Sequence, residues 1–371
     1  MFENYKTPAE LLPSDPRFGC GPSLVPVEFL EKLAATGNTL IGTSHRKPAV
    51  KNLVKEVQEG LAKFFNIPSD YEVVLGNGGA TFLFDMIALG LVKNKATHFT
   101  CGEFSQKWFK SSNSVPWIEA SEVASEYGHG VITTDVEGSD LIATTLNETS
   151  TGVQIDSLPD VGDDTLLCVD ATSGAGQVAC DVSKTDVFFF SPQKVFASEG
   201  GLWVAIMSPK AIARSKEIEE AKDRYIPGIM SWDAAISNGK KNQTYNTPSI
   251  STIFFLNEQV KLMNEFGGYE KAIEYAEKKA SLLYGWAAEK DYLSCYVEDD
   301  KFRSRAVATI DLDEKYDAAA LIKVFAAEGS VNGIDAYRKL GRNQFRISLF
   351  HNVKLEDLEK LTKMISMAIE E

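Results

Sequence analysis

The chain has few of the features that mark secreted, metal-binding or membrane proteins. Its 371 residues include only five cysteines and four histidines. The cysteines are scattered and form no C-x-x-C pair, which argues against a disulfide framework and a zinc site and favours a reducing compartment. No apolar run is long enough to span a bilayer, and the amino terminus lacks the apolar segment of a signal peptide. We therefore expect a cytoplasmic protein without a metal.

Positive charge is also scarce. The sequence holds 38 Lys and Arg against 52 Asp and Glu, which gives a net charge of -14 at pH 7. This balance argues against nucleic acid or an anionic membrane as the partner. An anionic substrate would need local clusters of basic residues. With 44% hydrophobic and 24% charged residues, the composition is that of a globular protein long enough for two domains.

Apolar runs alternate with amphipathic stretches between residues 26 and 209, which predicts a mostly parallel sheet with helices on both faces. The expected strands are 72–75, 96–100, 141–146, 166–169, 187–190 and 202–207, and the expected helices are 28–35, 49–65 and 81–91. Farther along, expected helices at 254–266, 269–289, 318–328 and 356–369 surround short strands at 306–312 and 345–350. We expect an α/β fold with a large domain (19–252) and a smaller α+β domain (253–371). The domain on which the amino-terminal arm (1–18) packs is left open.

A lysine follows one of the expected strands almost directly. The apolar run 187–190 is followed by Ser-Pro-Gln and then by Lys194. Ligands of open α/β sheets bind at the carboxyl ends of the strands. Burial lowers the pKa of a lysine from about 10.4, and the neutral amine is a nucleophile toward carbonyls. The alternative is a solvated loop lysine whose stem covers the sheet.

A glycine-rich turn, residues 76–81, separates the expected strand 72–75 from an apolar helix. Unpaired N–H groups and the positive end of the helix dipole make such a turn a phosphate cradle, although a purely structural turn is an equal alternative. It is not a dinucleotide fingerprint, because Thr81 stands where the last glycine would fall. The run 37–42 is not a Walker A loop, because Thr43 replaces the required lysine.

Asp170 ends the strand that precedes the strand of Lys194. A carboxylate at this place can pair with the protonated ring nitrogen of pyridoxal phosphate, which keeps the ring an electron sink. The alternative is an acid that caps the turn 171–174. These signals follow one another along the chain in the order phosphate loop, aromatic residue, acid and lysine. This order separates a pyridoxal phosphate site from the structural alternatives better than any one signal does.

Over essentially its whole length, the chain resembles the phosphoserine aminotransferases, which are fold-type I pyridoxal phosphate enzymes. The motifs that carry the resemblance are 18–22 (FGCGP), 43–46 (TSHR), 78–81 (GGAT), 147–149 (NET), 169–170 (VD), 191–194 (SPQK), 245–248 (YNTP) and 345–348 (FRIS). Residues 337–344 are most similar to the branch typical of actinobacteria.

The resemblance implies that Lys194 is the Schiff-base lysine and general base and that Asp170 holds the ring nitrogen. It also implies that Phe104 stacks on the ring and that Thr149 bonds the ring hydroxyl. The cofactor phosphate would be held by the backbone of two residues, by one side chain and by two residues from a second subunit: Ala80, Thr81, Gln193, Asn246 and Thr247. The enzyme would therefore be a homodimer with shared sites.

The resemblance also suggests substrate residues. Arg346 lies on a strand whose apolar residues alternate to the other face, and its guanidinium can grip an α-carboxylate with two hydrogen bonds. His45 and Arg46 match the family's pair for the substrate phosphate, with a solvated charged loop as the alternative. Where many relatives carry a His-Arg pair, this chain has Lys339 and Leu340. Which of three residues contacts the phosphate is left open: Arg338, Lys339 or Arg342.

The implied reaction transfers the amino group of glutamate to 3-phosphohydroxypyruvate and gives 3-phosphoserine and 2-oxoglutarate. Activity on the phosphorylated threonine precursor of vitamin B6 synthesis stays open. The alternative within the class is an aminotransferase of the serine or alanine glyoxylate type, which has less need for a second anion site. A dehydrogenase is disfavoured by Thr81 and by the missing ribose acid. A protein that has this fold but only binds ligands, without catalysis, would be expected to lack Lys194 or Asp170, and this chain has both.

Overall fold

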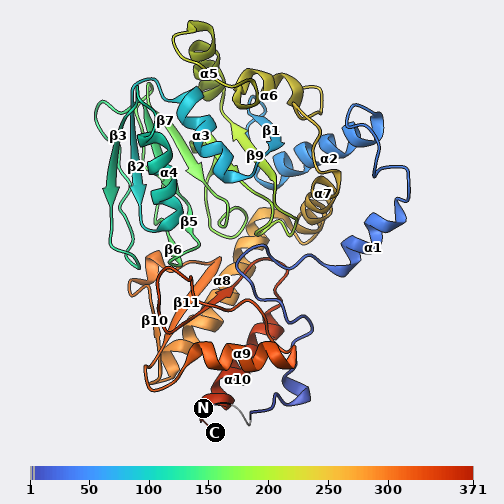
Figure 1. The fold of residues 1–371 in the computed structure, drawn as a ribbon, viewed down its shortest axis with the longest axis vertical. Coiled ribbons are helices and arrows are strands. Elements are labelled where there is room, and N and C mark those ends of the chain that lie inside the picture. The colour runs from blue at the N-terminus through green and yellow to red at the C-terminus, as the bar shows by residue number, and fades with distance from the viewer. Residues whose placement is uncertain (1, 3–4, 371) are drawn as a thin grey trace.

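Seven strands form the main sheet of the computed structural model, which describes residues 2 and 5–370. They run in the order β1-β9-β8-β7-β4-β2-β3 (Figure 1). Their bounds are β1 Glu72–Asn77, β2 Lys95–Thr100, β3 Glu119–Ala124, β4 Leu141–Thr145, β7 Leu166–Asp170, β8 Val187–Phe190 and β9 Leu202–Met207. Only β9 runs antiparallel to its neighbours in this sheet. The predicted mostly parallel α/β sheet is confirmed.

Helices cover both faces of this sheet. The alternation along β8 shows the two layers: Phe188 and Phe190 pack in the core that includes α2 (Pro48–Phe64) and α7 (Ile250–Glu265). Phe189 packs instead with residues of α3 and α4. The other helices of this part are α1 Val27–Ala35, which contacts α7, and α3 Ala80–Leu91, α4 Glu103–Asn113, α5 Pro209–Ala221 and α6 Trp232–Gly239. Since both faces are buried, the inner strands are apolar runs without alternation.

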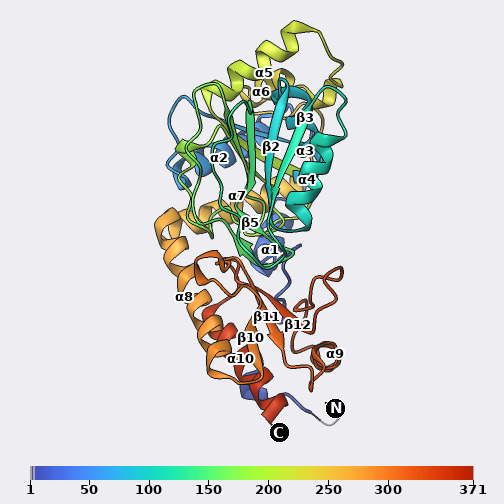
Figure 2. The same ribbon diagram turned by 90° about the vertical axis from the view of Figure 1, so that its left-hand side faces the viewer.

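A smaller antiparallel sheet lies below the main one (Figure 2). It consists of β10 Leu293–Cys295, β11 Val307–Leu312 and β12 Gln344–Ser348, and it packs with α8 Gly268–Glu289, α9 Ala318–Glu328 and α10 Leu355–Glu370. The amino-terminal arm contacts this part, because Phe2, Tyr5 and Phe18 lie in its core. Thr7 Oγ1 also donates to Glu328 over 2.6 Å.

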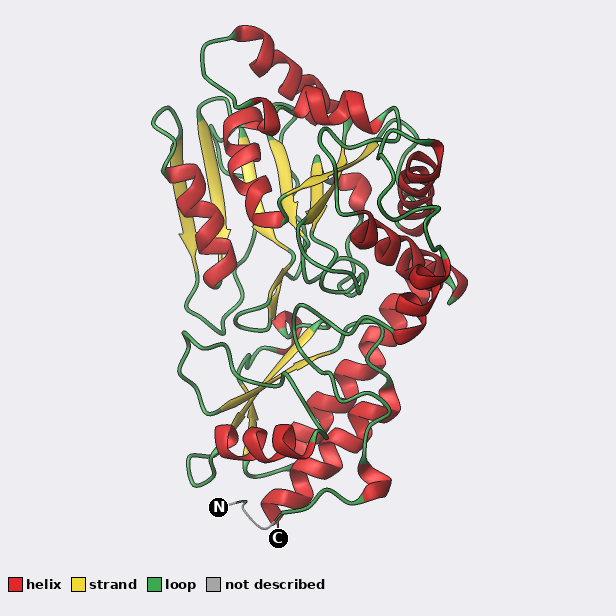
Figure 3. Ribbon diagram, turned by 45° about the vertical axis from the view of Figure 1, so that its right-hand side comes forward, coloured by secondary structure: helices red, strands yellow, loops and turns green. Residues whose placement is uncertain are grey.

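The division of the chain at residues 18 and 252 remains a proposal. By its contacts, α7 belongs with the main sheet, since it packs along α2. The long helix α8, prominent in Figure 3, passes from one core to the other: Ala272 lies in the first and Leu283 in the second. Packing therefore changes from the larger to the smaller part within α8. Among the described residues, no helix is both long and apolar enough to cross a membrane.

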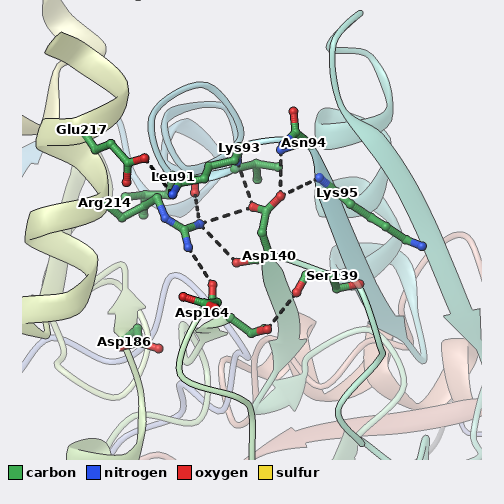
Figure 4. Close-up of polar contacts among 12 residues, drawn as sticks. Leu91, Lys93, Asn94, Lys95, Ser139, Asp140, Asp164, Asp186, Arg214 and Glu217 are labelled. Carbon is green, nitrogen blue, oxygen red and sulfur yellow. Dashed lines mark hydrogen bonds and ion pairs between the residues drawn. The ribbon is translucent and has the colours of Figure 1, made fainter. Parts of the chain in front are cut away.

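A partly buried ion pair holds the amino ends of the strands together (Figure 4). The carboxylate of Asp140, just before β4, accepts the backbone N–H groups of residues 93–95 over 2.7 to 2.8 Å. Arg214 of α5 lies 3.4 Å from this carboxylate and donates to the carbonyl oxygens of Leu91 and Asp164. The network closes the edge of the sheet opposite the carboxyl ends of the strands.

Candidate active site

A cavity of about 240 Å³ lies at the carboxyl ends of β4, β7 and β8. Of the residues predicted for the site, it brings together Ala80, Thr81, Phe104, Thr149, Asp170, Gln193 and Lys194. They come from stretches of the chain as far apart as residues 80 and 194, and they meet because parallel strands end at the same edge of the sheet. The order of signals in the sequence thus corresponds to one place in the fold.

Lys194 lies on the turn after β8 and lines this cavity. Its amine donates to the carbonyl oxygen of Cys20 over 2.7 Å. Burial, with a smaller contribution from the charge of Arg346, lowers the pKa of Lys194 to about 8, against the raising effects of Cys20, Asp170 and Glu148. An amine with this pKa is neutral in a substantial fraction of molecules near neutral pH, and it can act as a nucleophile or a base.

Asp170 is the last residue of β7 and is 3% exposed. Its Oδ1 accepts hydrogen bonds from the backbone N–H of Thr172 over 2.9 Å and from the Thr172 hydroxyl over 2.5 Å. Within the described chain, no hydrogen bond engages Oδ2. Burial raises the pKa of Asp170 to about 6, against the lowering effect of Thr172. At neutral pH the carboxylate is therefore mostly ionised and keeps one oxygen for a ligand.

The turn between β1 and α3 forms one end of the cavity. Gly79 adopts a φ of +75°, a backbone conformation that L side chains rarely adopt. The next two residues, Ala80 and Thr81, begin α3 and line the cavity. Their N–H groups have no partner among the described residues, as expected for the first turn of a helix. The turn is therefore built as an anion site.

Phe104, the second residue of α4, forms a wall of the cavity, and its ring lies edge-on to Tyr337 with centroids 6.1 Å apart. Tyr337 also packs against Arg346, whose guanidinium carbon lies 5.4 Å from the ring centroid. Arg346 donates from Nη1 to the carbonyl oxygen of Thr149 over 3.2 Å, while its buried Nε has no partner among the described residues. A guanidinium with an unused donor beside the cavity is suited to a carboxylate.

Besides Arg346, which lies next to the cavity, four predicted residues do not line it: His45, Arg46, Asn246 and Thr247. These four form a cluster of their own. His45 Nδ1 lies 3.2 Å from Thr247 Oγ1, and Arg46 donates to Gln243 Oε1 over 3.1 Å. The backbone carbonyl of Thr247 accepts from Asn77, which directly precedes the glycine turn. In a single chain, these residues border the phosphate turn without entering the cavity.

Two of the three candidates for a further phosphate contact, Arg342 and Lys339, differ in their surroundings. Arg342 is paired with Asp311 and stacks over Tyr296, so its guanidinium is occupied. Lys339 forms an ion pair of 2.5 Å with Glu103, beside Phe104. These two residues line a second cavity, of about 380 Å³, that shares the ring of Phe104 with the first. Lys339 is thus next to the site, and Arg342 is directed elsewhere.

Several residues of the cavity were not singled out from the sequence. Ser173 is one of them, and its hydroxyl lies 2.8 Å from Asn147 Nδ2 and from the hydroxyl of the predicted Thr149; Thr145 is another, with a buried hydroxyl that has no partner among the described residues. Thr145 ends β4, and Ser173 lies three residues after the end of β7. Position at a strand end is the signal that could have found Thr145. The contact of Cys20 with Lys194 spans 174 positions and has no local signal.

Comparison with known proteins places this site in a family. The model of the aminotransferase class-V family matches residues 21–361. The phosphoserine aminotransferase of Corynebacterium glutamicum (strain R) is 44% identical over 365 residues, which are 98% of this chain and 96% of that protein. The phosphoserine aminotransferase of a Nocardioides species is 43% identical over 374 residues and is matched over its full length.

Solved structures agree with this comparison. The phosphoserine aminotransferase of Cytophaga hutchinsonii has a TM-score of 0.87 and 26% identity, over 95% of this chain and 99% of that one. An alanine–glyoxylate aminotransferase from a Nostoc species has a TM-score of 0.79 but only 18% identity, over 99% and 97% of the two chains. The likeness to the second structure concerns the fold alone, so the fold by itself does not select the substrate.

Proposed function

Because the chain belongs to the phosphoserine aminotransferases of class V, we propose that the cavity around Lys194 and Asp170 transfers the amino group of glutamate to 3-phosphohydroxypyruvate. The products are 3-phosphoserine and 2-oxoglutarate, and the pathway is serine biosynthesis. The observation that carries the proposal is one cavity that joins a neutralisable lysine, a strand-end carboxylate and an anion-binding helix start.

The lining of the cavity fits pyridoxal 5'-phosphate, the cofactor of this class. The N–H groups of Ala80 and Thr81 have no partner in the described chain, and both residues line the cavity. The unengaged Oδ2 of Asp170 and the ring of Phe104 complete the set. When bound, pyridoxal phosphate supplies a protonated ring that withdraws electrons from the substrate Cα.

The residues of the chain then have separate roles. Ala80, Thr81 and Gln193 would hold the cofactor phosphate, Phe104 would cover the ring, and Thr149 would bind its hydroxyl. Asp170 would accept a hydrogen bond from the ring nitrogen. Lys194 would hold the cofactor and would move the proton at the substrate Cα, which a pKa of about 8 permits. Arg346 orients the substrate through its α-carboxylate.

The cluster of His45, Arg46, Asn246 and Thr247 serves the cavity of a second copy in this proposal. These residues lie outside the chain's own cavity, yet they include an imidazole with an unpartnered buried Nε2. Two exposed apolar side chains, Ile41 and Tyr245, lie close to them in the sequence. We therefore infer a homodimer in which Asn246 and Thr247 complete the cofactor phosphate site and His45 and Arg46 bind the substrate phosphate.

Mixing two inactive variants tests the shared site. Lys194→Ala and Arg46→Ala should each be weakly active or inactive. A heterodimer of the two contains one cavity in which both residues are intact, so unfolding and refolding the mixture should restore activity. If the mixture stays as inactive as its parts, Arg46 acts within its own chain. Sedimentation velocity provides the accompanying measurement of the dimer.

The reaction itself is tested with the purified protein. It should be yellow, and it should form 2-oxoglutarate from glutamate and 3-phosphohydroxypyruvate, with Lys194→Ala unable to do so. A colourless protein that takes up no added pyridoxal phosphate would refute the proposal. We also infer a cytoplasmic location, because all five cysteines are free thiols in the structure.

A further inference from the structure

The carboxylate of Glu148 is buried against the first turn of α4. It is 0% exposed and accepts the backbone N–H groups of Phe104 over 3.2 Å and of Ser105 over 2.9 Å. Ser150 donates its hydroxyl to Glu148 over 2.7 Å, and the oxygen of this hydroxyl accepts the N–H of Glu103 over 3.1 Å. The first three amides of α4 are therefore satisfied by residues that follow 43 to 47 positions later.

The segment before α4 offers no cap of its own. The N-cap residue is Gly102, which has no side chain, whereas the first N–H groups of a helix have no partner within it. A Cβ at Gly102 would lie 2.3 Å from Cγ of Glu148. Because residue 102 has no side chain, there is room for the carboxylate of Glu148, which caps the helix. Negative charge at the positive end of the helix dipole adds to this contact.

The capped turn carries a wall of the catalytic cavity. Phe104 is the second residue of α4, its N–H is bound by Glu148, and its ring lines the cavity. The residue next to Glu148, Thr149, also lines the cavity, and its carbonyl oxygen holds Arg346. We propose that Glu148 is a positioning residue for the transamination: by capping α4, it fixes the ring of Phe104 against the cofactor. The inference rests on the proposed function for the role of Phe104, and on the contacts alone for the cap.

The charge of Glu148 has only a minor influence on the catalytic groups. Burial is the largest influence on the pKa of both Lys194 and Asp170, and the charge of Glu148, which raises both pKa values, follows after larger influences. The role proposed for Glu148 is therefore the cap of α4 and not its charge.

The test compares Glu148→Gln with a matched control, Asp140→Asn. Asp140 also accepts three backbone N–H groups, but at the opposite edge of the sheet. In the cofactor-free protein, Glu148→Gln should speed hydrogen exchange at the amides of residues 103–105, whereas Asp140→Asn should speed it only at residues 93–95. Pyridoxal phosphate should bind about 10-fold more weakly to Glu148→Gln, as expected for the loss of charged hydrogen bonds, and within about 2-fold of wild type to Asp140→Asn.

A double-mutant cycle with Phe104→Ala shows whether Glu148 acts through the ring. In the Phe104→Ala background, Glu148→Gln should change the dissociation constant of pyridoxal phosphate by less than about 2-fold, because coupled residues are not additive. The same factor in both backgrounds, or an unchanged affinity in Glu148→Gln, would overturn the proposal. If Glu148→Gln does not fold, Ser150→Ala should weaken binding by about 3-fold with the same non-additivity, and an unchanged affinity would then overturn it. Failure of wild-type protein to bind the cofactor would refute the proposed function, while the exchange measurement would still test the cap.

Discussion

The amine of Lys194 should be half neutral near pH 8 in the cofactor-free protein, and its reactivity should rise with pH around that value. The main cause is removal of the amine from water, which penalises the charged form and lowers the pKa to about 8. At pH 7, a pKa of 8 leaves about a tenth of the amines neutral, against roughly 1 in 2,500 for an ordinary lysine. At pH 7, the neutral and nucleophilic form of the amine should therefore be about 200-fold more abundant at Lys194 than at an exposed lysine.

Competitive acetylation measures this directly, because acetic anhydride reacts with neutral amines. The cofactor-free protein is labelled briefly between pH 6 and 10, and the modified fraction of the Lys194 peptide is determined by mass spectrometry. The labelling of Lys194 is divided by that of the exposed Lys241, which corrects for the amount of reagent. Two variants should move the midpoint in opposite directions. Arg346→Gln removes a charge that lowers the pKa and should shift it upward, whereas Asp170→Asn removes one that raises the pKa and should shift it downward.

A midpoint near 10.4 in the wild type would show that the amine is fully solvated, and the assignment of Lys194 as a base poised near neutral pH would fail. Shifts of the same sign in both variants would contradict the electrostatic reasoning even if the midpoint were correct.

Asp170→Asn should bind the cofactor phosphate as the wild type does but lose most turnover, because an unprotonated ring is a poor electron sink; steady-state kinetics with a normal rate would leave Asp170 only a cap of its turn. Arg46→Ala should lower kcat/KM for 3-phosphohydroxypyruvate by about 10- to 150-fold relative to hydroxypyruvate, since one charge-assisted contact is lost. An unchanged ratio would favour a substrate of the glyoxylate type. Arg346→Ala should slow both half reactions, measured separately by single-turnover absorbance, because both substrates carry an α-carboxylate; an effect on one alone would be inconsistent with this role. Arg214→Met should lower the free energy of unfolding in urea by about 2 to 3 kcal/mol, less than a fully buried pair because Asp140 keeps its backbone partners, and turnover per folded molecule should not change.

The inner strands could be predicted because burial on both faces leaves a direct trace in the sequence. The run Val187–Phe190 is apolar at every position, and its residues alternate between two cores. The edge strand Glu119–Ala124 has no such trace, since most of its residues are partly or fully exposed, and it was not predicted. Helix α4 was missed for another reason. Its first amides are bound by Glu148 and Ser150, which lie 43 to 47 positions later in the sequence, and its N-cap residue, Gly102, has no side chain.

The candidate site also has a part that could be predicted from the sequence and a part that could not. The residues that end strands or start helices could be predicted to meet, because the topology of a parallel sheet brings those ends to one edge. The distance between His45 and the cavity could not be predicted, because it depends on long-range packing of residues 36–47 beside residues 243–247. The further step, which places this cluster at a second cavity, requires the surface of another copy and lies beyond the information in one folded chain.

Asp170 shows why local alternatives in a sequence need not exclude each other. The carboxylate could be interpreted either as a cap of the turn 171–174 or as the partner of a ring nitrogen. In the structure it caps the turn, since Thr172 donates two hydrogen bonds to Oδ1. Those bonds fix the orientation of the carboxylate and leave Oδ2 without a partner in the described chain. Because a group held in place before the ligand arrives costs less to order on binding, the structural contact with Thr172 supports the catalytic role that we propose for Asp170.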